Sequence, residues 1–122
     1  MIAVDTSVWA DHFRAPEPGL TDLIRTGSVL VHPFVIGELA MGRLPHAAKT
    51  LAALRALPRL MAVEEALFPD RVRALDLFAT GLGFVDAHLL LAVEARAGAR
   101  LWTRDKKLRD QATRLKLVSE QA

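Results

Sequence analysis

Apolar residues fall along this chain in short runs with two kinds of spacing, and these spacings predict strands and helices. Runs that are apolar at nearly every position, with many Val, Ile or Leu, are typical of strands buried on both faces. They predict strands over residues 2–4, 28–32, 60–64, 99–103 and 116–119, the third being either a short strand or an edge segment. Apolar residues three and four positions apart indicate amphipathic helices. They predict helices over residues 6–13, 20–27, 33–42, 46–57, 69–83, 85–98 and 105–115.

Strands and helices alternate along most of the chain, which favours an α/β fold with a central parallel sheet flanked by helices on both faces. A length of 122 residues suits a single domain, residues 1–122. In such sheets, functional groups gather beyond the carboxyl ends of the strands. Asp5 directly follows the first predicted strand, Thr103 ends the fourth, and Asp105 comes just after it. We therefore expect chemistry at these two strand ends.

Four acidic residues lie at strand ends or inside apolar segments. They are Asp5 after the first strand, Glu38 in "PFVIGELAMG", Asp86 in "VDAHLLLAVEA" and Asp105 after "RLWTR". Aspartate is a preferred helix N-cap, and the three aspartates stand at or just before predicted helix starts, so capping explains each of them taken singly. A capping role and a functional role both stay open for these three.

Glu38 does not fit a capping role, because it lies in the interior of its predicted helix. It shares a helical face with Phe34 and Met41, so the pattern predicts apolar surroundings for its carboxylate. An ionised carboxylate in such surroundings needs a cation nearby, or its pKa shifts. No Lys or Arg lies between Arg25 and Arg43. We therefore expect the cation to come from a distant part of the chain or from a metal ion.

Convergence of the four carboxylates would restrict the chemistry, since like charges packed together repel. A hard divalent cation such as Mg²⁺ or Mn²⁺ relieves that repulsion, takes oxygen ligands, and activates a water for attack on a phosphate. The chain has no Cys and no G-x-S-x-G motif, so the usual signs of a nucleophilic side chain are missing. It also has no glycine-rich phosphate-binding loop. Its histidines are scattered, and we expect all of them to be packed or at the surface: His12, His32, His46 and His88.

Composition and charge narrow the class of protein. The absence of cysteine excludes disulfides and agrees with a reducing cytoplasm. The N-terminus does not resemble a signal peptide, and no apolar stretch approaches the roughly 20 residues of a membrane span, so we expect a cytoplasmic protein without membrane contact. Sixteen basic and 14 acidic residues give a net charge of +2. Neutralising the four acids would leave 16 basic against 10 acidic residues, and a net charge of +6 suits a polyanionic partner.

Four stretches, "VDTSVW", "VIGEL", "GFVDAHLLLA" and "ARLWTRDKKL", resemble the PIN domain, and most closely the VapC ribonuclease toxins of bacterial toxin–antitoxin pairs. The resemblance covers nearly the whole chain in order and at suitable spacing, although "LMAVEEALF" carries no motif. It implies a parallel sheet flanked by helices and endonucleolytic RNA cleavage that depends on Mg²⁺ or Mn²⁺.

By position, the resemblance implies that the metal and its activated water are held by an acid quartet of Asp5, Glu38, Asp86 and Asp105. Thr103 corresponds to the hydroxyl that the family places at the end of this strand, and Ser7 is expected to act similarly beside Asp5. The resemblance further implies an RNA substrate, a homodimer, and a small VapB-like antitoxin protein that silences the enzyme.

Basic residues crowd the last fifth of the chain, beside the proposed site. Candidates for contact with RNA phosphates, each equally open to interpretation as part of a solvated helix face, are Arg104, Lys106, Lys107 and Arg109. Trp9 and Trp102 are expected in the core rather than stacked on bases. Two other functions stay open, namely a PIN nuclease in RNA processing and a non-catalytic α/β interaction module. A receiver-like module fits poorly, because His32 rather than Asp ends the second strand.

Overall fold

The centre of the protein is a three-stranded parallel sheet in the order β2–β1–β3, in a computed structural model that describes residues 1–121. The strands are β1 (Ile2–Val4), β2 (Val29–Leu30) and β3 (Arg100–Trp102). The register places Val4 beside Trp102. β1 and β3 therefore end at the same level, and the residues that follow them meet.

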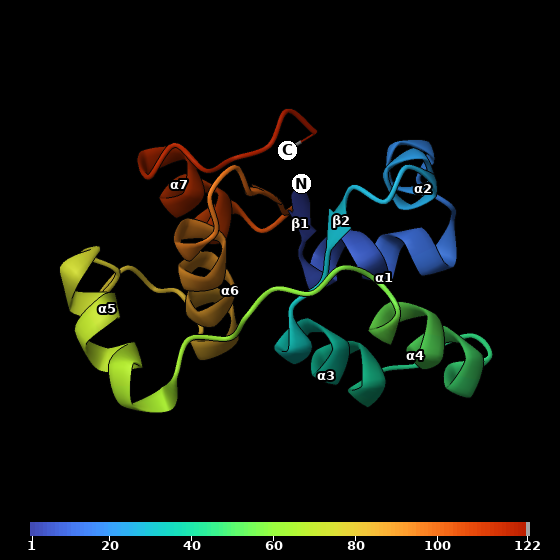
Figure 1. Cartoon of the computed structure of the whole chain (residues 1–122), viewed down its shortest axis with the longest axis horizontal. Coiled ribbons are helices and arrows are strands. Elements are labelled where there is room, and N and C mark those ends of the chain that lie inside the picture. Colours follow the sequence, from blue (N-terminus) through green and yellow to red (C-terminus); the bar gives the residue numbers. More distant parts are fainter. Residues whose placement is uncertain (122) are drawn as a thin grey trace.

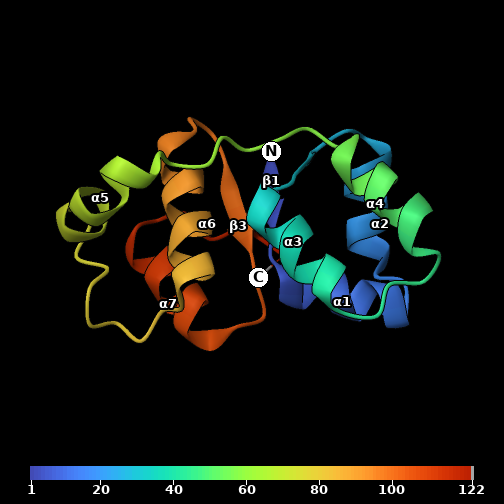
Figure 2. The same cartoon turned by 90° about the horizontal axis from the view of Figure 1, so that it is seen from below.

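Helices cover both faces of this sheet, as the alternation of strands and helices predicts. In both views α5, α6 and α7 lie on one side of the strands, and α1, α2 and α4 lie on the other (Figures 1 and 2). Every helix within residues 1–121 falls short of the length and apolarity needed to cross a membrane. The helices are α1 (Thr6–Arg14), α2 (Pro18–Arg25), α3 (Pro33–Met41), α4 (Ala47–Arg55), the 3₁₀-helix η1 (Glu65–Leu67), α5 (Phe68–Ala74), α6 (Phe84–Ala95) and α7 (Lys106–Arg114).

The core combines the all-apolar strands with α6. Residues 87–93 of α6 are buried without interruption, because a helix that is apolar all round has to be covered on every side. Trp9 and Trp102 are both buried in this core, which confirms the expectation from their apolar neighbours.

The carboxyl ends of the strands are surrounded by helix starts. α1, α3 and α7 begin directly after β1, β2 and β3, respectively. α3 packs on α1 and on α6, and α6 packs on α7. Figure 2 shows α1, α3, α6 and α7 grouped beside the strands.

Two of the predicted strands, over residues 60–64 and 116–119, are absent as full strands. Residues 60–64 are not a strand: Val31 forms a single parallel bridge with Arg59, and the chain then leaves the sheet, with Met61 85% exposed. Residues 116–119 touch β3 only through a bridge between Leu101 and Val118. Each segment is joined to an outer strand of the sheet by a single bridge, so neither forms a full strand.

The helix predicted over residues 69–83 ends at Ala74. Asp76 adopts a left-handed conformation with φ of 54°. Its N–H donates to the carbonyl of Arg73 at 3.2 Å, and the N–H of Leu77 donates to Val72 at 2.9 Å. This pair of bonds is the Schellman ending of a helix. The buried side chain of Leu77 then directs the chain toward α6.

Candidate active site

Asp5 stands at the end of β1 with its carboxylate held by three donors. The N–H of Thr6 donates to Oδ1 at 2.8 Å, and the hydroxyls of Ser7 and Thr103 donate to Oδ2 at 2.8 and 2.7 Å. Asp5 is 4% exposed. Its own N–H donates to the carbonyl of Trp102 at 3.0 Å. Oδ1 caps α1, whereas Oδ2 is oriented by two hydroxyls that capping does not require.

The turn after β3 is tied to the same carboxylate. The fully buried Thr103 donates to Asp5 through Oγ1, and the same oxygen accepts the N–H of Asp105 at 3.0 Å. On the other side, Ser7 Oγ accepts the N–H of Arg104 at 3.1 Å. Asp105 itself caps α7 through Oδ1. The two hydroxyls thus position the first and the fourth acid of the proposed quartet relative to each other.

Glu38 projects from α3 toward the start of α1, where Thr6 Oγ1 donates to its Oε1 at 2.7 Å. The expectation of apolar surroundings for this carboxylate was wrong. The helical face that Glu38 shares with Met41 is exposed, and Met41 is 90% exposed. α3 instead turns Val35 and Leu39 toward the core. A carboxylate on this face reaches the strand ends and keeps contact with water.

Asp86 lies half-buried in the first turn of α6 and does not cap that helix, whose N-cap is Gly83. Burial, together with the negative charges of Asp5, Asp105 and Glu38, raises the pKa of Asp86 from 3.8 to about 6. Charges near a protein surface act over roughly 10 Å before salt screens them. The four acids therefore share one electrostatic environment beyond the strand ends.

Comparison with known proteins agrees with this geometry. Residues 2–113 match the PIN domain. The chain belongs to the PIN-domain family. Ribonuclease VapC32 from two strains of Mycobacterium tuberculosis is 42% identical over 109 residues, which cover 89% of this chain and 88% of that protein. The likeness to VapC-type PIN domains, predicted from four short motifs, is confirmed.

The donor chemistry of this PIN domain fits a hard divalent cation. The groups facing the strand ends are carboxylates and hydroxyls, so all the donors are oxygens, which Mg²⁺ and Mn²⁺ prefer. Within residues 1–121, no three His, Cys, Asp or Glu side chains are already gathered closely enough to hold a metal ion. A cation would have to draw the carboxylates together. The raised pKa of Asp86 reflects the repulsion, in part, that such a cation would relieve.

Arg104, one of the expected RNA contacts, forms ion pairs with acidic side chains of the protein itself. Its guanidinium pairs with Asp11 at 2.5 Å and with Glu17 at 2.9 Å. Asp11 also pairs with Arg14. Arg104 therefore connects the turn after β3 of this PIN domain to α1 and to the start of α2. Sequence reasoning missed these pairs, because no local pattern connects residues about 90 positions apart.

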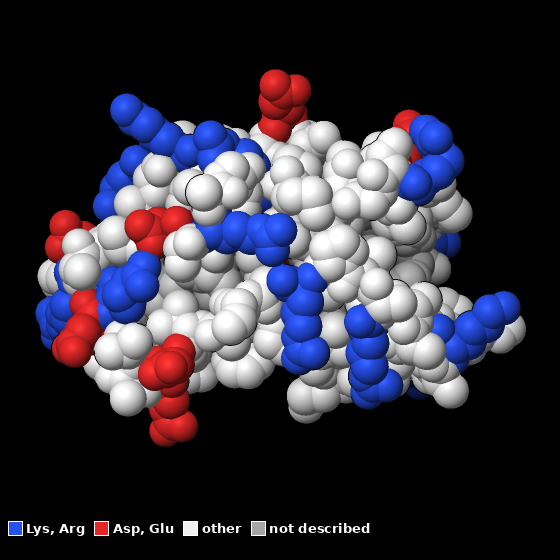
Figure 3. All heavy atoms as spheres, viewed as in Figure 1, with Lys and Arg blue, Asp and Glu red and all other residues white. Residues whose placement is uncertain are grey.

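The other three basic candidates lie on α7. Arg109 donates through Nη2 to the carbonyl of Thr103 at 3.1 Å, and Lys106 is exposed. Lys107 extends over the loop before α6, where a Cβ added to Gly81 would stand 3.2 Å from its Nζ. In the view of Figure 3, basic side chains without acidic neighbours lie over α3 and α4, whereas acids gather around α5. RNA contact by α7 stays a prediction.

Two of the four histidines, His32 and His88, are packed in the interior of the protein. His88 is buried and stacks on Phe68 with ring centroids 4.1 Å apart. Burial lowers the pKa of His88, and burial with the charges of His88 and Arg59 lowers the pKa of His32 to about 4. Both rings are therefore neutral at pH 7, and they pack as the apolar pattern around them predicts.

Proposed function

We propose that this protein is a VapC-type ribonuclease toxin that hydrolyses RNA phosphodiesters, with Mg²⁺ or Mn²⁺ held by Asp5, Glu38, Asp86 and Asp105. The observation that carries the proposal is the placement of the four acids near one another beyond the strand ends, where burial and the charges of Asp5, Asp105 and Glu38 raise the pKa of Asp86 to about 6. The name of the relative VapC32, a ribonuclease, supports the choice of RNA as substrate. The absence of cysteine fits a cytoplasmic enzyme.

When bound, the cation supplies charge neutralisation at the phosphate and an activated water. The protein's own residues orient the donors beforehand. Ser7 and Thr103 hold Oδ2 of Asp5 from two sides, and Thr6 holds Oε1 of Glu38. Such outer contacts fix a ligand's direction and raise metal affinity. Asp86, in contrast, has no hydroxyl beside it among the hydrogen bonds of the described residues, so we infer that it adjusts when the metal enters.

The test is cleavage of total RNA by the purified protein in Mg²⁺, Mn²⁺ or EDTA, beside Asp5→Asn, Glu38→Gln and Asp86→Asn. Each variant keeps the size of the side chain and removes its charge. We expect cleavage only with a divalent cation, and a loss in each variant beyond the roughly 10–100-fold of outer-shell changes. Asp22→Asn is the matched control, because Asp22 lies on α2 and pairs at the surface with Arg25.

Equal activity of all variants would refute the proposal that the four acids hold the metal. Intact RNA in every condition would favour a non-catalytic α/β interaction module. Growth arrest on expression, relieved by Asp5→Asn, would separate a toxin from a nuclease that processes RNA.

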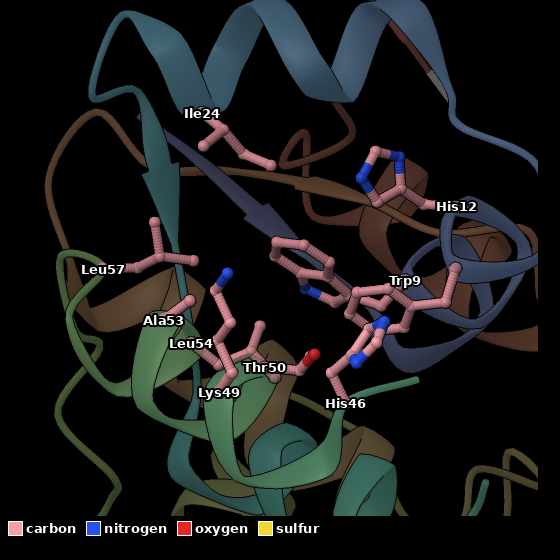
Figure 4. A pocket seen from close by; sticks show the side chains of 10 residues that line it. Trp9, His12, Ile24, His46, Lys49, Thr50, Ala53, Leu54 and Leu57 are labelled. Atoms are coloured by element: carbon pink, nitrogen blue, oxygen red, sulfur yellow. The ribbon is translucent and has the colours of Figure 1, made fainter. Parts of the chain in front are cut away.

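We further infer that a small VapB-like antitoxin protein binds a cavity of about 380 Å³ between α1, α2 and α4 (Figure 4). Its walls are largely apolar and include Phe13, Ile24 and Leu57. Trp9 lines it, and the indole N–H is buried without a hydrogen-bond partner in the described part of the chain. Lys49 extends toward the same space (Figure 4). An amphipathic helix that carries a carboxylate would complement both the walls and these donors.

We also infer a homodimer. Phe34 and Phe84, the latter 64% exposed, both pack edge-on against His88, at 4.8 and 4.6 Å between ring centroids. Together they form an exposed apolar surface across α3 and α6, which a second copy of the chain would cover. Light scattering should give twice the chain mass of 13.4 kDa, and Phe84→Ser should shift it toward the monomer. A monomer at every concentration would contradict this inference.

A further inference from the structure

A second cavity, of about 430 Å³, opens from the proposed acid site and runs between α1 and the end of α3. We call it the α1–α3 groove. Thr6 and Glu38, which are hydrogen-bonded to each other, line its inner end. Arg14 lines it eight residues further along α1, a distance of about 12 Å at 1.5 Å per residue. The volume lies within the range of about 300–1,000 Å³ of sites for small ligands and nucleotides.

The two ends of the α1–α3 groove carry opposite charges. The inner end holds the carboxylate of Glu38, and the outer end is lined by Arg14 and Arg43. Arg14 pairs with Asp11, whereas Arg43 makes no ion pair with any acidic side chain of residues 1–121. Arg43 is exposed, so its guanidinium is available to an anion from solvent.

Between these ends the α1–α3 groove is apolar. Phe13, Leu39 and Leu44 form its walls. A site with a cation-binding end, an apolar middle and an arginine at the far end matches a nucleotide chain, in which phosphates alternate with a ribose and a flat base.

We propose that the α1–α3 groove binds the nucleotide next to the scissile phosphate of a single-stranded RNA. The reacting phosphate lies at the acids, the ribose and base lie against the apolar walls, and Arg43, assisted by Arg14, binds the neighbouring phosphate. Arginine suits this task, because its planar guanidinium donates two parallel hydrogen bonds to phosphate oxygens. The inference rests on the proposed nuclease function and assigns the direction in which the substrate leaves its active site.

The first experiment measures binding by fluorescence anisotropy, with a labelled single-stranded RNA oligonucleotide in EDTA, so that metal-dependent cleavage does not interfere. Arg43→Glu should weaken binding about tenfold. Arg43→Gln should lower the slope of log Kd against log salt by about 0.7, as expected for one lost phosphate contact on a single strand. Arg25→Glu and Arg25→Gln are the matched controls, since Arg25 is an exposed arginine on α2 that does not line the groove.

The second experiment measures steady-state cleavage of the same RNA in Mn²⁺. Arg43→Glu should raise KM by about the factor found for binding and leave kcat nearly unchanged, as for a contact made equally in the ground and transition states. Ala10→Trp fills the groove from an exposed position on α1 without changing its charge, and should raise KM as well. Circular dichroism of each variant checks that the helices are intact.

The two proposals fail in different ways. If the wild type does not bind RNA, or if Arg43→Glu binds it equally well, the proposal that the α1–α3 groove binds RNA is wrong. Cleavage whose KM is the same in wild type, Arg43→Glu and Ala10→Trp also overturns it, while the nuclease proposal stands. RNA binding that depends on Arg43, in a protein that cleaves no RNA with any divalent cation, supports the groove and overturns the nuclease.

Discussion

Thr103 donates a hydrogen bond of 2.7 Å to Oδ2 of Asp5, although 98 positions separate the two residues. They meet because β1 and β3 are parallel neighbours that pair Val4 with Trp102. The same hydroxyl oxygen accepts the N–H of Asp105 at 3.0 Å. One buried hydroxyl therefore orients two of the four proposed metal ligands, which makes it a sensitive position for a test.

Thr103→Val should impair the proposed metal site without changing the volume of the side chain. The change removes a donor to Asp5 and leaves Oδ2 with Ser7 alone. We expect Mn²⁺ affinity, measured by calorimetry, to fall roughly 10–100-fold. We also expect unfolding free energy to fall by about 1–3 kcal/mol, because a buried partner is left unpaired. Thr113→Val, which removes an exposed hydroxyl on α7, is the control. Unchanged Mn²⁺ affinity would show that Thr103 does not position a ligand.

Asp86→Asn should stabilise the metal-free protein at neutral pH. The pKa of Asp86 lies at about 6 in the folded state, above its ordinary value of 3.8. The folded protein therefore binds more protons than the unfolded chain between about pH 4 and pH 6, and stability falls as pH rises through this window. Two pKa units correspond to about 3 kcal/mol, which we reduce to about 1 kcal/mol because the half-exposed carboxylate is screened by solvent.

Thermal unfolding in EDTA measures this effect. Asp86→Asn should melt about 4 °C above the wild type at pH 8, and the two should converge near pH 4, where the wild-type carboxyl is protonated. Mn²⁺ at pH 8 should reverse the order, since a cation that binds the folded state stabilises the wild type more. A melting difference that does not depend on pH would contradict the electrostatic explanation.

Arg104→Met should lower stability more than it lowers RNA binding. Its guanidinium pairs with Asp11 and Glu17, so removal of the charge frees the turn after β3. For partly exposed pairs we expect a loss of about 1 kcal/mol, which should shrink in high salt. Urea titrations at two salt concentrations measure it. Lys107→Met is the control on α7, and a larger effect of Arg104→Met on RNA affinity than on stability would support the prediction that Arg104 contacts RNA.

Ala53→Glu should prevent inhibition by the proposed VapB-like antitoxin while the proposed RNA cleavage continues. Ala53 lines the apolar cavity between α1, α2 and α4 and lies outside the acid site. A carboxylate there would occupy the space and repel an acidic partner. Inhibition of RNA cleavage by the co-purified antitoxin should weaken at least about tenfold. Ala48→Glu places the same charge on α4 at a position that does not line the cavity. Full inhibition of Ala53→Glu would place the antitoxin elsewhere.

Local patterns in the sequence were sufficient for the main elements and for the strand-end acids. The apolar runs of β1 and β3 marked where each strand ends, and a parallel sheet brings such ends together. The apolar stretch "VDAHLLLAVEARAG" predicted a helix over residues 85–98, and residues 87–93 of α6 are buried. Capping is also local, which explains why Asp5 and Asp105 fit both the capping and the functional interpretation.

Only the tertiary structure decided which helical face is covered and which distant groups meet. Periodicity grouped Glu38 with Met41, but packing against α1 and α6 selects the face of Val35 and Leu39 as the buried one. Helical spacing defines the faces of a helix, whereas the neighbours that cover a face come from other parts of the chain. The bond from Thr6 to Glu38 and the pairs of Arg104 likewise join residues without any sequence periodicity in common.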